Sequence, residues 1–354
     1  MKYRPLGRSG IQVSELILGA MMFGSWGTRD EGEARRVIVR AVESGINFID
    51  TADTYSDGQS ELVVGSVLHD IGRDNLIVAT KFHMPMGPDR NERGNSRRWI
   101  RRACEASLRR LRTDRIDLYQ VHRPDPSCDI DETLGALTDL VREGKVLLIG
   151  TSTFPAEQIV EAQWTAERRH RERFRTEQPP YSILSRSVET AVLPTCGRYG
   201  LGVITWGPLG GGWLSGRFGS GAVNTTLRSE RQPDKYDVSR SSNQVKLAAV
   251  DRLSMIARDA GMSLLELSIA FVLEHPLVSA TIVGPRSVDQ LDAYLAAGDR
   301  RLDSDILDAI DDVVAPGSDI EPLELGWDRS QLEVEFRRRR RDHGPEASLR
   351  RAST

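Results

Sequence analysis

Four polar side chains in the first third of the chain stand at or just beyond the ends of short apolar segments. They are an acid, a phenol, an amine and an imidazole: Asp50, Tyr55, Lys81 and His122. A phenol has a pKa near ~10 in water, and a neighbouring ammonium group favours its ionised form. Lowering that pKa by ~3 units needs about 4 kcal/mol of differential interaction. We expect Asp50 to hold Lys81, Lys81 to tune Tyr55 as a proton donor, and His122 to orient a bound carbonyl group.

Each of these residues also has a structural explanation when it is taken alone. Asp50 can cap the turn after its strand, Tyr55 can be a loop aromatic, and Lys81 can be a charge at a strand end. His122 is a more specific signal, because it stands directly at a predicted strand end and a proline, Pro124, follows shortly after it. It is the joint placement of the four that indicates a catalytic site.

The elements that must position these side chains alternate between short apolar runs and amphipathic helical patterns. Apolar runs of this kind are typical of buried parallel strands, and catalytic residues of a (β/α)8 TIM barrel lie at the carboxyl ends of its strands. The sequence therefore predicts such a barrel, and neighbouring strand ends would bring the four side chains together. The expected strands are Leu16–Phe23, Phe48–Asp53, Leu76–Phe82, Ile116–Arg123, Val146–Thr153, Phe174–Gln178, Val203–Pro208 and Ala280–Gly284.

Three further segments complete the predicted organisation. An opening β-hairpin, residues 3–6 and 11–13, would cover the bottom of the barrel. The segment Gly216–Asn243 after the seventh strand has little periodicity and is expected to be a long loop at the catalytic face. Residues 1–317 are predicted to form a single barrel domain, and residues 318–354 a polar tail with a basic run, Arg337–Arg341. Such charge blocks usually mark solvated tails, and contact with an anionic partner is the less common alternative.

Composition excludes several classes of function. The net charge of −3 argues against a nucleic-acid partner, and no apolar run is long enough for a secretion signal or a membrane span. We therefore expect a cytoplasmic protein with no membrane partner. The three cysteines form no CxxC pair and are expected to be reduced thiols, and the histidines have no metal-ligand spacing, so no metal is predicted. The oligomeric state is left open.

Several separated motifs, in order, resemble those of the aldo-keto reductase superfamily. The segment 48–55 with Gly58 and Glu61 is similar to the family's signature around its catalytic Asp and Tyr, and segments 78–81 and 117–122 are similar to its lysine and histidine strands. Segments 144–146 and 149–152 resemble the family's segment that reaches the amide group of the nicotinamide. The resemblance runs from the hairpin to about Val314 and implies the barrel fold and an NADPH cofactor.

By that resemblance the roles of the four residues are general acid for Tyr55, carbonyl orientation for His122 and tuning of the phenol by Lys81 with Asp50. The resemblance also implies hydrogen bonds to the nicotinamide carboxamide, an indole stacked on the ring, a glycine-rich pyrophosphate loop and an adenosine-phosphate segment. The implied cofactor contacts are Ser152, Gln178, Trp206, Gly207, Pro208, Leu209, Gly211, Gly284, Arg286 and Gln290. The planar fork of Arg286 suits a 2′-phosphate, which favours NADPH over NADH.

The chain departs from the family pattern at the adenine end. It has Ala293 and Tyr294 where the family often has Glu and Asn, and Gly207 where serine is frequent in close relatives. The strictness of NADPH over NADH therefore stays open.

The sequence predicts an NADPH-dependent reductase that converts an aldehyde or ketone to an alcohol, with the proton from Tyr55. One alternative is a cofactor-binding regulatory barrel similar to potassium-channel β-subunits, with little turnover. Another is a lyase or isomerase that uses Lys81 as a Schiff-base amine. The substrate, whether small aldehyde, quinone or sugar-nucleotide ketone, is not identified. Candidate pocket residues near the strand ends are Trp26, Phe82, Met84, Met86 and Arg123.

Overall fold

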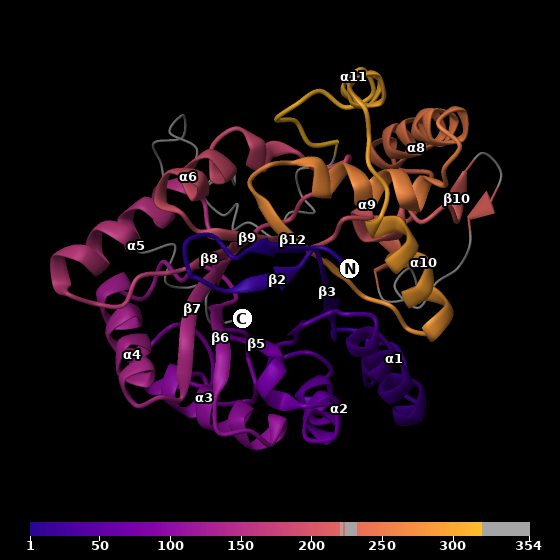
Figure 1. The fold of residues 1–354 in the computed structure, drawn as a ribbon. Coiled ribbons are helices and arrows are strands. Elements are labelled where there is room, and N and C mark those ends of the chain that lie inside the picture. The colour runs from indigo at the N-terminus through magenta and orange to yellow at the C-terminus, as the bar shows by residue number, and fades with distance from the viewer. Residues whose placement is uncertain (220–221, 224–231, 321–354) are drawn as a thin grey trace. The chain divides into compact units, whose positions relative to one another are not determined.

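Eight parallel strands close into a barrel, and their order around it follows the chain, with the last strand pairing with the first. The structure is a computed structural model that describes residues 1–219, 222–223 and 232–320 of the 354 (Figure 1). This arrangement confirms the predicted (β/α)8 fold. The barrel strands are β3 (Leu16–Gly19), β4 (Phe48–Asp50), β5 (Ile77–Phe82), β6 (Ile116–Val121), β7 (Val146–Ser152), β8 (Thr176–Gln178), β9 (Gly202–Thr205) and β12 (Val278–Val283).

Helices surround the barrel (Figure 1), and those that pack against it do so with an apolar stripe. In α1 the buried residues Ala34, Val37, Ile38 and Ala41 recur at the spacing of one helical face. The N-cap Asp30 accepts hydrogen bonds from the first turn of this helix and satisfies its free N–H groups. The helices are α1 (Glu31–Glu43), α2 (Gln59–Leu68), α3 (Arg97–Leu111), α4 (Ile130–Arg142), α5 (Ala156–Arg169), α6 (Val192–Tyr199), α8 (Ser241–Asp259), α9 (Leu264–Glu274), α10 (Val288–Gly298) and α11 (Ser304–Asp311).

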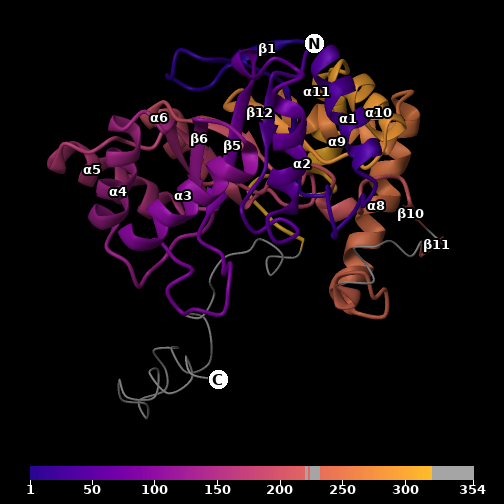
Figure 2. The ribbon, with the colours of Figure 1, turned by 90° about the horizontal axis from the view of Figure 1, so that it is seen from below.

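The opening hairpin closes one end of the barrel, as the sequence predicts. Its strands β1 (Tyr3–Pro5) and β2 (Gln12–Ser14) pair antiparallel at the end of the barrel where the N-terminus lies (Figure 2). Leu6 and Val13 are fully buried and pack with the inward-facing apolar side chains of the strands, such as Phe48. The hairpin thus plugs the amino-terminal ends of the strands and leaves the carboxyl ends for chemistry.

The segment after β9 is longer than any other connection, but part of it is regular. A two-residue strand β10 (Phe218–Gly219) pairs with β11 (Ala222–Val223), and α8 begins at Ser241, before the predicted end of the loop. The Tyr236 hydroxyl donates to the main-chain oxygen of Gly211 at 2.8 Å. This bond ties the segment to the glycine-rich turn after β9. Residues 220–221, 224–231 and the tail from 321, with its basic run, lie outside the described residues.

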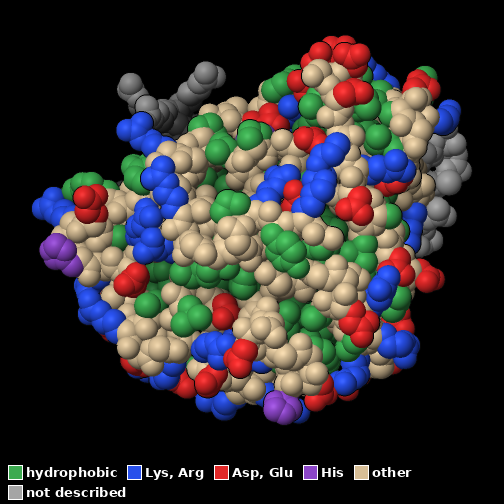
Figure 3. All heavy atoms as spheres, viewed as in Figure 1, with side chains coloured by type: hydrophobic (Ala, Val, Ile, Leu, Met, Phe, Trp, Pro, Cys, Tyr) green, Lys and Arg blue, Asp and Glu red, His purple; other side chains and the backbone are tan. Residues whose placement is uncertain are grey.

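The surface carries charges of both signs. On the face shown in Figure 3, basic and acidic side chains are both widely distributed. Several form exposed ion pairs, such as Arg35 with Asp70 at 2.9 Å and Arg40 with Asp292 at 3.0 Å. In the part of the chain that the structure describes, no helix combines the length and apolar character that crossing a bilayer requires.

Candidate active site

The first two barrel strands end earlier than predicted, because the chain beyond them turns to line the open end of the barrel. β3 ends at Gly19 and β4 at Asp50. The backbone after β4 stays attached to β5, since the N–H of Asp53 donates to the oxygen of Lys81 at 3.1 Å. In the parallel register Lys81 of β5 lies opposite Gln120 of β6. The fold therefore brings the ends of β4, β5 and β6 together, as the four predicted residues require.

Lys81 is the centre of the site. Its Nζ donates to Asp50 Oδ1 at 2.6 Å, to the main-chain oxygen of Thr51 at 2.8 Å and to the Tyr55 hydroxyl oxygen at 3.2 Å. Burial by itself lowers the pKa of this fully buried amine, but Asp50 and Tyr55 more than offset that effect and the pKa lies above its ordinary value. Lys81 is therefore a charged ammonium that directs one of its three protons at the phenol.

The other carboxylate oxygen of Asp50 is held by two amides. Gln120 Nε2 donates to Asp50 Oδ2 at 3.1 Å, and Gln178 Nε2 donates to the same oxygen at 2.9 Å. Gln178, predicted to contact nicotinamide, thus also supports the acid that holds Lys81. Sequence reasoning missed Gln120, although it precedes His122 by two residues and alternation along a strand places both on the same face.

His122 lies edge-on to Tyr55, with ring centroids 5.7 Å apart. Burial, with a smaller contribution from the Lys81 charge, holds the imidazole pKa well below 6.5, so the ring is neutral near pH 7. Its Nδ1 is buried and has no hydrogen-bond partner within the described residues. The single N–H of the neutral ring is therefore best placed on Nε2, where it can donate to the oxygen of a carbonyl group.

The residues predicted to hold the nicotinamide lie together at the ends of β7, β8 and β9. Ser152 Oγ donates to the main-chain oxygen of Gln178 at 3.0 Å. The Trp206 indole is half-buried, and its Nε1 has no partner among the described residues. Gly207 has φ +74° and Gly212 has φ +110°, and a Cβ at either position would meet no atom within 4 Å. These features fit a dinucleotide, because they offer a flat aromatic surface and a glycine backbone beside open space, which a phosphate group can approach closely.

The predicted adenosine-phosphate segment lies at the start of α10. The N–H of Arg286 donates to Gln290 Oε1 at 2.9 Å, so Gln290 orders the turn itself. Thr28 Oγ1 donates to the Arg286 oxygen at 2.9 Å, and the N–H of Val288 donates to Glu33 Oε1 at 3.2 Å. Sequence reasoning missed Thr28 and Glu33, because they are distant in sequence and carry no motif.

Two of the candidate pocket residues, Trp26 and Phe82, lie on different sides of the strand ends. The Trp26 ring lies 6.1 Å from the Tyr55 ring, which places it beside the reacting phenol. Phe82, in contrast, is fully buried and packs against Tyr119 at 4.8 Å between ring centroids. Its assignment to the pocket is wrong. Alternation along β5 explains this, since Lys81 points into the barrel and Phe82 points towards the helices.

A buried network beneath the Tyr55 loop involves Glu61 of the signature motif. Glu61 accepts hydrogen bonds from Thr80 Oγ1 at 2.5 Å and from Arg110 Nε at 2.6 Å. Asp53 is also fully buried, and burial, followed by the charge of Glu61, raises its pKa well above 3.8. The network joins α2, β5 and α3, and so supports the loop that carries Tyr55.

Glu177 is another buried carboxyl group, next to Gln178 in β8. It accepts hydrogen bonds from Thr151 Oγ1 at 2.5 Å and from the N–H of Phe154 at 3.1 Å. Burial is nevertheless the largest influence and raises its pKa from 4.5 to about 7. In the unfolded chain this carboxyl ionises near its ordinary pKa, so between that value and about 7 only the folded state keeps the proton. Stability should therefore fall as the pH rises through this window.

We expect Glu177→Gln to remove this pH dependence, because an amide cannot ionise. Its oxygen can still accept from the Phe154 N–H, and its NH₂ group can donate to Thr151 Oγ1, whose own proton is then directed at the main-chain oxygen of Thr176. The variant's free energy of unfolding, relative to wild type, should rise by about 3 kcal/mol between pH 4 and pH 8. Urea unfolding of both proteins across this range measures the difference. A difference that stays constant with pH would show that the pKa of Glu177 is the same in the folded and the unfolded protein, and would contradict the raised pKa.

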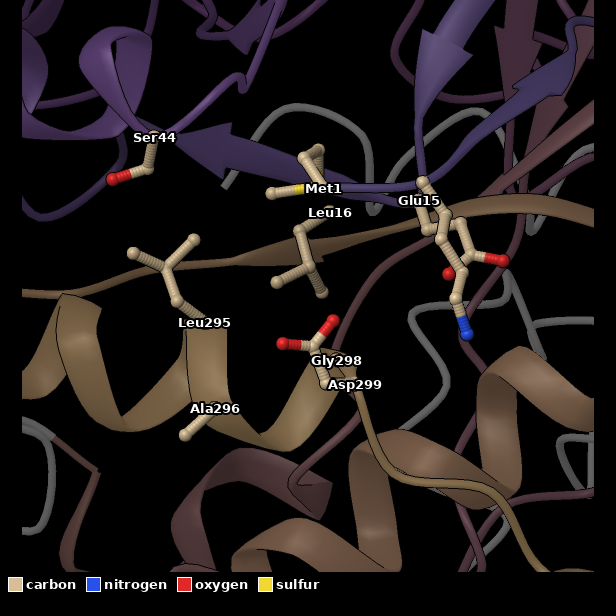
Figure 4. Close-up of a pocket in the computed structure, with 9 residues that line it drawn as sticks. Met1, Glu15, Leu16, Ser44, Leu295, Ala296, Gly298 and Asp299 are labelled. Carbon is tan, nitrogen blue, oxygen red and sulfur yellow. The ribbon is translucent and has the colours of Figure 1, made fainter.

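A separate pocket of about 210 Å³ lies at the opposite end of the barrel (Figure 4). It lies between Met1, Leu16 at the start of β3, and Leu295 and Gly298 of α10. Because the four catalytic candidates are at the carboxyl ends of the strands, this pocket is not the active site. Elsewhere in the described ranges, no three His, Cys, Asp or Glu side chains gather as a metal site requires.

Comparison with known proteins supports the assignment. Residues 15–315 match the model of the Aldo/keto reductase family. The uncharacterized oxidoreductase YrpG of Bacillus subtilis is 37% identical over 339 residues, covering 92% of this chain and 100% of that protein. The aldo-keto reductase YhdN of the same organism is 33% identical over 297 residues, covering 83% and 87%. A probable voltage-gated potassium channel subunit beta of Arabidopsis thaliana is 35% identical over 320 residues, covering 89% and 97%. The chain therefore belongs to the aldo/keto reductase family.

Proposed function

We propose that this protein is an NADPH-dependent reductase that converts an aldehyde or ketone to an alcohol. The observation that carries the proposal is the buried Lys81 ammonium, which bridges Asp50 and the Tyr55 hydroxyl beside a neutral His122. A phenol with an ammonium partner and a neutral imidazole suits protonation of a carbonyl oxygen. It does not resemble a hydrolytic site, which needs an activated nucleophile.

The residues have distinct roles in this proposal. His122 donates a hydrogen bond to the carbonyl oxygen and orients it towards Tyr55. When bound, NADPH supplies the hydride to the carbonyl carbon. Tyr55 then gives its proton to the developing alkoxide, and the Lys81 ammonium stabilises the phenolate that remains. Trp206 would flank the nicotinamide, and Ser152 and Gln178 would hold its carboxamide.

A Schiff base on Lys81 fits this geometry poorly. The amine is fully buried, it donates hydrogen bonds to three oxygen atoms, and its pKa is above the ordinary value. A nucleophilic lysine needs a depressed pKa and an accessible lone pair. The lyase or isomerase alternative is therefore the weakest of the three.

A regulatory barrel is the second candidate, because relatives named as potassium-channel β-subunits match most of this chain. The two proposals differ in turnover.

We expect the purified protein to oxidise NADPH when it is mixed with benzaldehyde, a quinone or a keto-sugar. Absorbance at the nicotinamide band follows the reaction, and fluorescence titration measures NADPH binding. Tight binding without turnover of any carbonyl compound would favour the regulatory barrel, and absence of binding would contradict both.

The preference for NADPH should depend on two opposing charges at the start of α10. The Arg286 guanidinium has no partner among the described residues and can bind a 2′-phosphate. The Glu33 carboxylate occupies the N–H of Val288, where that phosphate would also bind. Arg286→Gln should weaken NADPH binding by about tenfold with little effect on NADH. Glu33→Gln, as the matched variant, should strengthen NADPH binding relative to NADH. Equal effects of either substitution on both cofactors would place the 2′-phosphate elsewhere.

A further inference from the structure

A guanidinium group stands at the catalytic end of the barrel without a carboxylate beside it. Arg123 directly follows His122 and is half-buried. Its Nη1 donates to the main-chain oxygen of His122 at 2.6 Å and to Thr153 Oγ1 at 3.2 Å. Among residues 1–219, 222–223 and 232–320, no Asp or Glu oxygen forms an ion pair with it within 4.0 Å.

Such an isolated charge is unusual, because buried or partly buried ions are normally paired. Burial lowers the pKa of the Arg123 guanidinium, and the acidic groups that oppose this effect are Tyr55 and Glu177. Neither is an ion-pair partner, since Tyr55 is the proposed proton donor and Glu177 keeps its proton up to about pH 7. An arginine side chain stays charged under all these conditions. The site therefore presents a cation that the described chain does not neutralise.

The position of Arg123 shows what could supply the missing charge. The guanidinium carbon lies 6.0 Å from the centroid of the Trp206 ring, and His122 contacts Tyr55 at 5.7 Å between rings. Arg123 is thus adjacent both to the pair that would hold the carbonyl oxygen and to the indole that would flank nicotinamide. Its Nε and Nη2 donors have no partner within the described residues. These two N–H groups form the edge of the fork that binds a carboxylate through two parallel hydrogen bonds.

We infer that Arg123 binds an acidic substituent of the substrate, so that the enzyme takes aldehydes or ketones that carry a carboxylate. This inference rests on the proposed reductase function and narrows its substrate class. A phosphate of the cofactor is the competing occupant, because the glycine-rich turn follows Trp206. The position of Arg123 beside His122 favours the substrate, and the two occupants give different results in one experiment.

The experiment compares carboxybenzaldehydes with their methyl esters, which have the same ring and aldehyde but no charge. The ortho, meta and para isomers vary the distance between carbonyl and carboxylate, so the preferred isomer reports the reach from Tyr55 to Arg123. For each pair the ratio of kcat/KM for acid over ester is measured in wild type, Arg123→Gln and Arg123→Lys. NADPH affinity is measured by fluorescence in the same proteins. The ratio cancels any general loss of activity that follows from disturbing His122 or Thr153.

We expect wild type to prefer one acid isomer over its ester, and Arg123→Gln to lower that ratio by about 10- to 100-fold. Arg123→Lys should retain part of the preference, because it keeps the charge and loses the fork. Arg168→Gln is the matched control, since Arg168 also lies over an indole, that of Trp164 at 5.0 Å, but on the surface. It should leave the ratio unchanged.

Three outcomes would overturn the inference. Equal ratios in wild type and Arg123→Gln would assign Arg123 only a supporting role for His122 and Thr153. Weaker NADPH binding in Arg123→Gln with an unchanged ratio would place a cofactor phosphate at this group. Reduction of esters and uncharged aldehydes without preference for any acid would reject the substrate class and leave the reductase function intact. Failure to reduce any of the carbonyl compounds would instead reject the proposed function itself.

Discussion

Replacing Tyr55 with phenylalanine should lower kcat by about 10²- to 10⁴-fold, because general acid catalysis of this kind typically contributes that factor. The hydroxyl is the proton source in the proposed reaction, and its hydrogen-bond donor in the structure is Lys81 Nζ at 3.2 Å. The phenylalanine ring would keep the contacts with Trp26 and His122. Steady-state kinetics on the best aldehyde substrate measures the loss of kcat, and an NADPH titration measures cofactor affinity separately.

NADPH affinity should change little in this variant, since the lost atom is not among the predicted cofactor contacts. Tyr119→Phe is the matched control, because it removes the hydroxyl of a buried tyrosine away from the site, whose hydrogen bond within the described residues is a 3.5 Å contact with the oxygen of Ile100. That control should retain near wild-type kcat. Substantial turnover in Tyr55→Phe would assign the proton transfer to another group, with His122 the first to test.

Asp50→Asn should destabilise the fold by about 3–5 kcal/mol, the usual cost of leaving a buried charge without its partner. In the native site each carboxylate oxygen is occupied, one by Lys81 and the other by the amides of Gln120 and Gln178. An asparagine side chain has one oxygen, so its NH₂ group would face either the ammonium or the two amide donors. Urea unfolding of wild type and variant gives the free-energy difference.

The double variant Asp50→Asn with Lys81→Met tests the cause of this destabilisation. If the loss comes from an unpaired ammonium, removing that ammonium should recover a large part of the stability, although the activity stays low. Additive losses in the two single variants would show that Asp50 and Lys81 contribute independently. A loss below about 1 kcal/mol in Asp50→Asn alone would contradict the buried ion pair.

The barrel was predictable because its signals are local. Short apolar strands, capped amphipathic helices and a hairpin can each be recognised from a short stretch of sequence. The alternation of strand and helix then leaves few possible topologies. The positions of Asp50, Lys81 and His122 follow from the same signals, since each stands at the end of a recognisable strand. The exact ends of β3 and β4 were not predictable, because the loops after them remain bonded to the neighbouring strand.

The supports of the site belong to the tertiary structure. Gln120 and Gln178, from two other strands, both donate to Asp50. Glu33 accepts a hydrogen bond from the start of α10, which is far away in the sequence. No local pattern encodes such contacts, because they depend on which strands become neighbours and on the register between them.

The sequence by itself determined the barrel, the family and the four residues whose types suit carbonyl chemistry. Only the tertiary structure decided that Phe82 faces the helices, that the Lys81 ammonium has all three protons donated, and that Arg123 stands without a counter-charge next to the site. The physical reason is that residue type and spacing are properties of the chain, whereas burial and charge neutralisation depend on groups that folding brings from distant segments.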